Sequence, residues 1–220
     1  MERLHLKTIF FLRHGKTEYT GNFPDLTDTG KEEIRSSAEE LHRLITKKPN
    51  KTVRIISSPA PRALGSADII ASKLGNGIKV EKEDAIRCMD FYNEKQANMI
   101  WTKFGTARDV DRAYATHPTF ESGIAIERRS SIQARFEGFL QRLFLESHTI
   151  DCPDFTICTS HFEILWKLAS MTRRHRTEPL SHGELIRMSV RPNDDSVSVV
   201  VEFRGDILEM SSINAHELMN

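Results

Sequence analysis

The chain has 220 residues, which suits one ordinary α/β domain with a modest insertion rather than two domains. Hydrophobic residues make up 39% of it and charged residues 28%, which is typical of a soluble globular protein and argues against extended disorder. Lysine plus arginine and aspartate plus glutamate each number 31, so the balance gives no general attraction to nucleic acid or to an anionic membrane. We therefore expect neither as a partner, and any recognition of phosphate must be local.

The N-terminal residues and the cysteines indicate the compartment. Residues 1–7 lack the apolar core of a signal peptide, and no later stretch approaches the roughly 18–20 apolar residues that span a bilayer. The three cysteines, Cys88, Cys152 and Cys158, are odd in number and lack the spacing of metal ligands, which argues against a disulfide framework. We predict a cytoplasmic protein.

The first third of the chain alternates strands and helices. Residues 8–12 form a short, continuous apolar run, which predicts a strand buried on both faces, and residues 53–56 predict a second strand. The helix expected from Gly30 carries its apolar side chains at Ile34, Ala38, Leu41 and Ile45. The helix expected after Pro61 carries them at Leu64, Ala67, Ala71 and Leu74. This alternation predicts a parallel sheet covered by helices.

The rest of the chain predicts an insertion and the completion of the sheet. The stretch 87–123 is polar and broken by glycine and proline, and we interpret it as a helical insertion that covers one end of the sheet. A long amphipathic helix follows, with an apolar face at Ile132, Phe136, Phe139, Leu140 and Leu143. The remaining predicted elements are a third inner strand at 155–159, a helix at 162–171, and an edge hairpin formed by 197–203 and 207–210. We predict a single three-layer α/β/α domain over residues 1–220, with a mostly parallel central sheet.

Each of the three inner strands ends beside residues suited to phosphate chemistry. Arg13 and His14 follow the first strand, Arg62 follows the second, and His161 follows the third. In open α/β sheets, ligands bind outside the carboxyl ends of the strands, where helix N-termini also attract anions. Two histidines and two arginines at these ends predict a phosphate pocket.

Six segments resemble, in order and over nearly the whole chain, the motifs of the histidine phosphatase (phosphoglycerate mutase-like) superfamily. The first, Leu12–Glu18, is similar to the Arg-His-Gly motif of its phosphatase branch. The others are Leu26–Gly30, Ser57–Ala63, Pro118–Ser122, Thr159–His161 and Pro192–Asn193. The resemblance implies a phosphoglycerate mutase-like fold.

The resemblance also implies the roles of the four phosphate-suited residues. His14 would attack phosphorus and become a phosphohistidine. Arg13 and Arg62 would bind the phosphoryl oxygens as bidentate donors, and His161 would stabilise the charge of the transition state. No metal or other cofactor is implied, because the guanidinium and imidazole groups supply the positive charge.

Asn22 and Thr27 are weaker candidates for phosphate binding. They fall in the loop that edges the pocket in the members that the chain resembles.

The sequence departs from the family at the acid and after the second histidine. Members usually carry a glutamate that protonates the leaving oxygen and later activates water, and this position here is Cys88, a poor acid at neutral pH. We predict Asp90 as its replacement. The alternatives are Asp84, Glu94, Glu163 or no residue at all. Phe162–Glu163 stands where the family has two glycines, so Phe162 is expected to narrow the pocket.

Three functions follow from these motifs. The leading prediction is a metal-independent phosphatase for a small phosphomonoester or a phosphoprotein, with weak activity and a preference for good leaving groups because of Cys88. The alternatives are a phosphate-binding or assembly module that has lost catalysis, and a phosphoglycerate mutase, to whose paired arginines Arg128 and Arg129 are superficially similar. Phe91, Tyr92 and Trp101 are the expected apolar contacts of the substrate. The natural substrate and the oligomeric state stay open.

Overall fold

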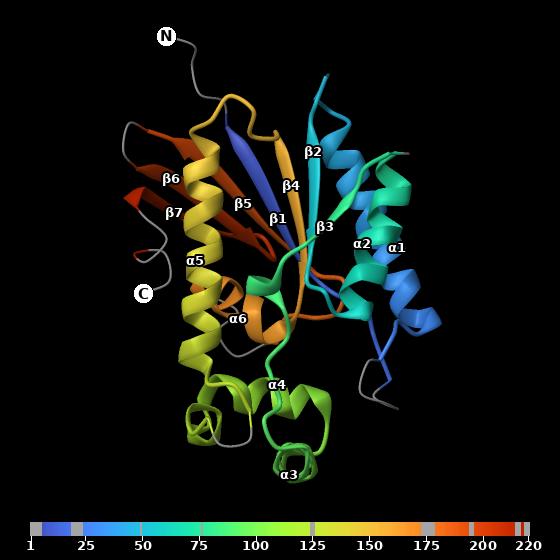
Figure 1. The fold of residues 1–220 in the computed structure, drawn as a ribbon. Coiled ribbons are helices and arrows are strands. Elements are labelled where there is room, and N and C mark those ends of the chain that lie inside the picture. Colours follow the sequence, from blue (N-terminus) through green and yellow to red (C-terminus); the bar gives the residue numbers. More distant parts are fainter. Residues whose placement is uncertain are drawn as a thin grey trace.

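A seven-stranded sheet with helices on both faces forms the centre of the computed structural model (Figure 1). The structure describes residues 6–18, 24–48, 50–75, 77–123, 126–172, 179–193, 196–213 and 217. The strands are β1 (Lys7–Arg13), β2 (Val53–Ser57), β3 (Val80–Lys82), β4 (Phe155–Ser160), β5 (Leu185–Pro192), β6 (Val197–Phe203) and β7 (Asp206–Ile213). The α-helices are α1 (Asp28–Ile45), α2 (Pro61–Leu74), α3 (Glu94–Phe104), α4 (Ala107–Thr116), α5 (Arg129–Ser147) and α6 (Phe162–Met171). Two short 3-10 helices are η1 (Asp84–Ile86) and η2 (Pro118–Glu121).

The strand order is β3-β2-β4-β1-β5-β6-β7. The first four of these strands are parallel to one another, whereas β5, β6 and β7 pair antiparallel. The predicted α/β fold with a mainly parallel central sheet is confirmed, and the predicted hairpin at the sheet edge corresponds to β6 and β7. The sequence does not predict the edge strand β3 or the inner strand β5. The single-domain assignment over residues 1–220 stays a prediction.

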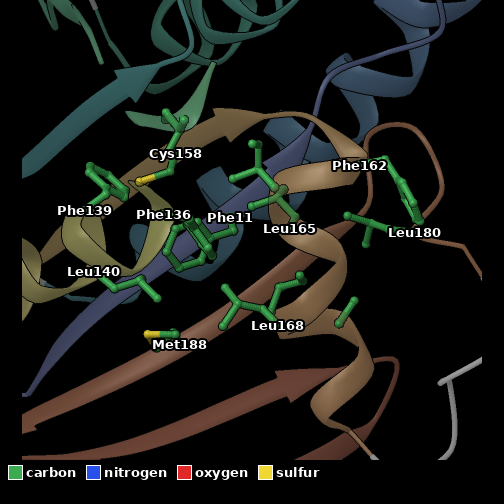
Figure 2. Close-up of a cluster of buried hydrophobic side chains, with 14 of the residues drawn as sticks. Phe11, Phe136, Phe139, Leu140, Cys158, Phe162, Leu165, Leu168, Leu180 and Met188 are labelled. Atoms are coloured by element: carbon green, nitrogen blue, oxygen red, sulfur yellow. The ribbon is translucent and has the colours of Figure 1, made fainter. Parts of the chain in front are cut away.

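The two faces of β1 pack against different helices. Phe10 and Leu12 belong to the apolar cluster of α1 and α2, whereas Ile9 and Phe11 belong to the cluster of α5 and α6. Figure 2 shows the second cluster, in which the ring of Phe11 meets Phe136 of α5 edge-on at 5.7 Å between centroids. Because side chains alternate along a strand, a continuous apolar run is what a strand covered on both faces requires.

The helices confirm most of the predicted apolar faces. All four predicted positions of α1 and all five of α5 are buried. In α2, Ala67 and Ala71 are buried as predicted, but Leu64 and Leu74 are only half-buried, while Ala63 and Ile70 complete the face. Small side chains let α2 lie close to the sheet. Its buried face therefore follows the alanines and is rotated away from Leu64 and Leu74.

The segment predicted as an insertion forms α3, α4 and η2. These helices lie beyond the carboxyl ends of β1, β2 and β4, next to the start of α6 (Figure 1). Val110 and Tyr114 of α4 are buried, and the ring of Tyr114 contacts Phe162 of α6 at 6.3 Å. None of the helices in the described ranges is long and apolar enough to cross a membrane.

Candidate active site

The carboxyl ends of β1, β2 and β4 meet at one place. The amide of His14 donates to the carbonyl of Ser160 at 3.0 Å, and the amide of Ser58 donates to the carbonyl of Thr159 at 3.0 Å. These bonds extend the parallel ladders past the strand ends. They bring His14, Ser58 and His161 together at the same edge of the sheet.

Two glycines hold the loop after β1 against the start of α1. A Cβ atom on Gly15 would lie 2.3 Å from the carbonyl oxygen of Gly30, and one on Gly30 would lie 2.2 Å from that of Lys16. Thr27 is the N-cap of α1: its hydroxyl accepts from the amide of Gly30 at 3.0 Å and donates to the carbonyl of Lys16 at 3.2 Å. Both hydrogen bonds of the Thr27 hydroxyl are therefore made to backbone groups. Asn22 lies outside the described residues, and phosphate binding by either residue stays a prediction.

His14 is buried, with its two ring nitrogens in different environments. Nδ1 lies 2.8 Å from the carbonyl oxygen of Gly15, which can only accept, so Nδ1 carries the proton and donates it. Nε2 then holds the lone pair and accepts from Nε of Arg62 at 3.2 Å. Burial, followed by the charges of Arg62 and Arg13, holds the pKa of His14 well below its usual 6.5. The imidazole is therefore neutral at physiological pH, with Nε2 as a nucleophile.

His161 lies beside His14 at the N-terminus of α6, and the two ring centroids are 5.0 Å apart. Its Nε2 is 2.7 Å from the hydroxyl of Ser58, and its buried Nδ1 has no hydrogen-bond partner among the described residues. Burial, followed by the neighbouring His14 and Arg62, keeps the pKa of His161 well below 6.5. An unpaired buried nitrogen is unfavourable. His161 is not among the residues that line the cavity beside His14, so its role in stabilising the transition state stays a prediction.

Arg13 is held by contacts on several sides. Its Nη1 donates to the carbonyl of Leu180 at 2.5 Å and to the carboxylate of Asp111 at 3.0 Å, and its guanidinium lies 5.3 Å from the centre of the Phe162 ring. Its Nε is buried without a hydrogen-bond partner in the described part of the chain. Arg62 is also buried. Phe162 thus stacks on one of the two arginines of the site, and the expectation that it narrows the pocket stays a prediction.

A cavity of about 50 Å³ opens over these residues. Arg13, His14 and Arg62 form its polar base, and the two acidic side chains among its described lining residues are Asp111 and Glu163. The remaining lining residues are Cys88, Met89, Phe91, Val110, Tyr114 and Phe162. At roughly 10–15 Å³ for each water-sized group, this volume accommodates about the four oxygens of a phosphate.

Of the predicted apolar contacts whose side chains are described, Phe91 reaches this cavity and Tyr92 does not. Phe91 lines it and is 50% exposed, and Tyr92 next to it is 59% exposed. The side chain of Trp101 lies outside the described residues. No three His, Cys, Asp or Glu side chains are grouped to hold a metal ion in the described ranges.

The predicted replacement acid does not lie at the cavity. The carboxylate of Asp90 pairs with Arg87 at 2.5 and 3.3 Å and is not among the lining residues. Asp84 is exposed, and nothing is described of the side chain of Glu94. Glu163 does line the cavity, and its Oε1 accepts from the amide of Met89 at 2.9 Å. A catalytic role for Asp90 stays a prediction that this placement does not support.

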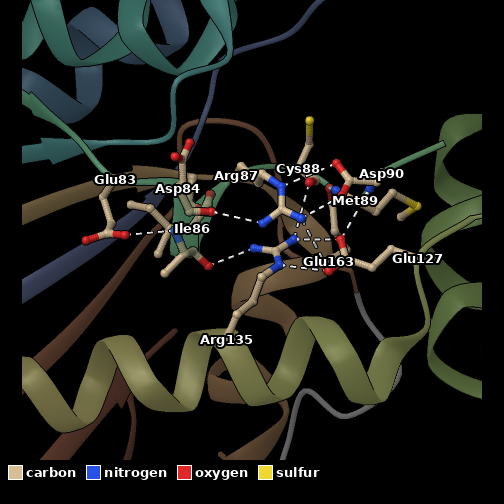
Figure 3. A network of polar contacts seen from close by, with 12 residues as sticks. Glu83, Asp84, Ile86, Arg87, Cys88, Met89, Asp90, Glu127, Arg135 and Glu163 are labelled. Carbon is tan, nitrogen blue, oxygen red and sulfur yellow. Dashed lines mark hydrogen bonds and ion pairs between the residues drawn. The ribbon is translucent and has the colours of Figure 1, made fainter. Parts of the chain in front are cut away.

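Figure 3 shows how the segment that carries Cys88 is fixed. The guanidinium of Arg135, on α5, donates to the carbonyls of Ala85 at 2.7 Å and Cys88 at 3.2 Å. It also pairs with the buried carboxylate of Glu127 at 3.0 and 3.1 Å. Glu127 in turn accepts from the amide of Asp90 at 3.2 Å. The Cys88 segment is therefore fixed by Arg135 of α5 and by the isolated β-bridge between Phe91 and Ile126, next to Glu127.

Two residues at the site are missed by the sequence interpretation. Asp111 of α4 has a side chain only 14% exposed, and burial raises its pKa to about 6 although the neighbouring Arg13 opposes the shift. The ring centroid of His182 lies 5.7 Å from that of His14, and burial, then Arg13 and Lys16, lowers the pKa of His182 to about 3. For Asp111 there is a signal in the sequence, because it falls within one turn of the apolar residues Val110 and Tyr114. His182 follows no periodic element and carries no such signal.

Comparisons with known proteins agree with this geometry. The sequence matches the histidine phosphatase superfamily (branch 1) over residues 9–191. A search of curated proteins gives no match.

Three solved structures illustrate the likeness of the fold. The chain is similar to a mycobacterial glucosyl-3-phosphoglycerate phosphatase in complex with VO3, with a TM-score of 0.63 and 17% identity over 91% of this chain and 99% of that one. It is also similar to mycobacterial hydrolase 2, with a TM-score of 0.62 and 17% identity over 97% and 95% of the two chains. For a phosphoglycerate mutase from Bacillus anthracis the TM-score is 0.58, at 17% identity over 97% and 95%. At these identities the likeness establishes the fold and leaves the substrate open.

Proposed function

This chain belongs to the histidine phosphatase superfamily, and we propose that it is a metal-independent phosphatase that acts through a phosphohistidine on His14. The observation that carries the proposal is the state of His14: buried, neutral, and with the lone pair of Nε2 3.2 Å from Nε of Arg62. A nucleophilic nitrogen held beside a guanidinium is the pair that phosphoryl transfer to histidine requires.

The chemistry follows from the groups around His14. Phosphoryl oxygens bound in the cavity take over the N–H groups of Arg62 and Arg13, which frees Nε2 of His14 to attack phosphorus. The bond to the leaving oxygen breaks as the N–P bond forms. Water then attacks phosphorus, the N–P bond breaks, and inorganic phosphate and neutral His14 are released. The two guanidinium groups offset the negative charge of the phosphoryl group in both steps.

The substrate proposed is a phosphomonoester, of a small molecule or of an exposed protein side chain. The phosphatase of similar fold is named for a small phosphorylated sugar derivative, and the exposed Phe91 at the cavity mouth offers apolar contact to the body of such a molecule. A preference for good leaving groups is proposed as well, because Cys88 supplies no acid. Phosphoglycerate mutase activity stays a prediction: Arg129 donates to Glu121 at 2.7 Å and to the carbonyl of Tyr114 at 2.8 Å, and these contacts give no specific support for it.

One observation favours the binding-module alternative. Cys88 lines the cavity at the position of the usual acid, and its thiol, whose pKa is raised by burial, is a poor proton donor to a leaving oxygen. Both functions use the same phosphate pocket. They differ in whether His14 is phosphorylated and the phosphohistidine is then hydrolysed.

The test is hydrolysis of p-nitrophenyl phosphate in the presence of a chelator, combined with trapping of acid-labile phosphoenzyme from a labelled substrate. We expect turnover and label in the wild type, and loss of both in His14→Ala. His42→Ala, in the last turn of α1 at the end opposite Thr27, is the matched control and should keep both. A wild type that binds vanadate but neither turns over nor carries label would reject the phosphatase and favour the binding module.

A further inference from the structure

One carboxylate of the helical segment over the sheet reaches the phosphate site. Asp111 lies on α4, its side chain is 14% exposed, and its Oδ2 is 3.0 Å from Nη1 of Arg13. It lines the same cavity as His14 and Arg62. A carboxyl group in this place is within reach of groups bonded to a phosphorus atom that Arg13 holds.

The other acidic residues near the cavity are engaged elsewhere. Glu163 accepts the amide of Met89 and thereby holds the Cys88 segment to α6. Asp90 pairs with Arg87 outside the lining. Of the two carboxyl groups among the described lining residues, Glu163 accepts from a backbone amide and Asp111 does not.

The surroundings of Asp111 favour its protonated form when a substrate binds. The charged groups that face it are Arg13 from β1 and Glu163 from α6, and Phe162 and Tyr114 line the same cavity. Burial is the largest cause that raises the pKa of Asp111 to about 6, and Glu163 adds to it. A phosphate dianion bound by Arg13 raises it further, because a like charge nearby disfavours the carboxylate.

We propose that Asp111 is the catalytic acid and base of this chain, supplied by α4 in place of the glutamate that the family carries at the position of Cys88. The proposal rests on the proposed function. In the first step the Asp111 carboxyl gives its proton to the leaving oxygen as the bond from that oxygen to phosphorus breaks. In the second step the carboxylate takes a proton from water as the oxygen of that water bonds to phosphorus and the N–P bond of phosphohistidine breaks. The carboxyl is regenerated after each cycle.

The test compares Asp111→Asn with Asp90→Asn on two substrates whose leaving groups differ. An alkyl phosphate needs a proton on its leaving oxygen, whereas p-nitrophenolate leaves without one. In Asp111→Asn we expect kcat/KM for the alkyl phosphate to fall about 100-fold or more, and that for p-nitrophenyl phosphate to fall less than about 10-fold. Asp68→Asn, exposed on α2, is the control and should leave both within about two-fold. A loss selective for the alkyl phosphate in Asp90→Asn, and not in Asp111→Asn, would assign the acid to Asp90 and overturn the proposal.

A second readout concerns the phosphoenzyme. Because the base for the second step is lost, Asp111→Asn should give a burst of p-nitrophenol and accumulate labelled His14, while Asp111→Glu should recover part of the alkyl phosphate activity. Equal losses on both substrates without accumulation would overturn the proposal. So would a gain in kcat/KM, which would mean that Asp111 only competes with phosphate for Arg13. A wild type that forms no phosphohistidine would instead overturn the proposed function, and this proposal with it.

Discussion

The thiol of Cys88 lies where a carboxyl group could reach the cavity. It is a lining residue, and burial, followed by the charge of Glu163, raises its pKa above the usual range of a thiol. The thiol is therefore protonated and uncharged at neutral pH, too weak an acid to assist the leaving oxygen. The position is well placed for catalysis, but a thiol is the wrong chemical group for a proton donor there.

This placement predicts that Cys88→Glu restores what Asp111→Asn loses. In the double variant we expect kcat/KM for an alkyl phosphate to rise at least about 10-fold above that of Asp111→Asn alone, because a second acid again lines the cavity. Cys88→Gln in the same background is the control for size and polarity, and it should give no recovery. Recovery by Cys88→Gln as well would show that packing, rather than proton transfer, is changed at this position.

Motifs predicted four of the site residues, because each follows the end of an apolar strand. His14, Arg13, Arg62 and His161 could be assigned to one edge of the sheet from their strand ends alone. Asp111 belongs to α4, and its meeting with Arg13 depends on how that helix folds back over the sheet. The apolar residues beside Asp111 could indicate that it faces inward, but a contact that spans 98 residues of sequence leaves no pattern that identifies Arg13 as its partner.

The segment before Asp90 depends on one buried ion pair. The side chain of Glu127 is 5% exposed and that of Arg135 is 13% exposed, and together they hold the backbone on both sides of Cys88 (Figure 3). A buried ion pair contributes little net stability, but the loss of one partner leaves an uncompensated charge.

Arg135→Met is therefore expected to lower the free energy of unfolding by about 3–5 kcal/mol, measured by urea denaturation. Glu127→Gln added to it should recover part of this loss, because the orphaned carboxylate is removed. Arg142 lies on the same helix as Arg135, and its side chain is 53% exposed. Arg142→Met removes its pair with Glu83 and should cost less than about 1 kcal/mol. A loss in Arg135→Met no larger than in Arg142→Met would show that Glu127 is not held by this pair.

Most elements with a strong period could be predicted, and those without one could not. The long helices α1 and α5 repeat apolar residues every three or four positions over 18 and 19 residues. β3 has three residues, too few for a pattern. β5 does alternate, because Arg187, Ser189 and Arg191 separate the buried apolar residues Ile186, Met188 and Val190, and the sequence interpretation missed this pattern. The buried face of α2 is built around Ala63 and Ala67, whose small side chains carry little hydrophobic signal.

Three histidines kept uncharged around one site make the whole molecule sensitive to acid. His14, His161 and His182 all have pKa values lowered by burial. Below pH 6.5 the unfolded chain binds protons that the folded chain excludes, so stability is lost as the pH falls. Asp111 acts in the opposite direction, because between its usual 3.8 and about 6 the folded chain binds the proton more readily.

The histidines outweigh Asp111, so the free energy of unfolding should fall by about 3 kcal/mol between pH 7.5 and pH 5.5. His182→Gln should recover about 1 kcal/mol of this difference, since one of the three excluded protons no longer counts. Urea denaturation at the two pH values measures both quantities. A free energy that is constant over this range, or a variant with the same decrease as the wild type, would show that His182 is not kept neutral by the fold.

The position of β4 between β1 and β2 has a consequence for the order in which the chain acquires its structure. During synthesis, β1 emerges about 140 residues and β2 about 100 residues before β4, the strand that joins them, so each presents an open edge in the interval. Pairing over such sequence distances is slow compared with the formation of α1 or α5. His14, Ser58 and His161 meet only across β4, and the carbonyl of Leu180 that fixes Arg13 follows later still. The ability to bind phosphate is therefore among the last properties that the nascent chain gains.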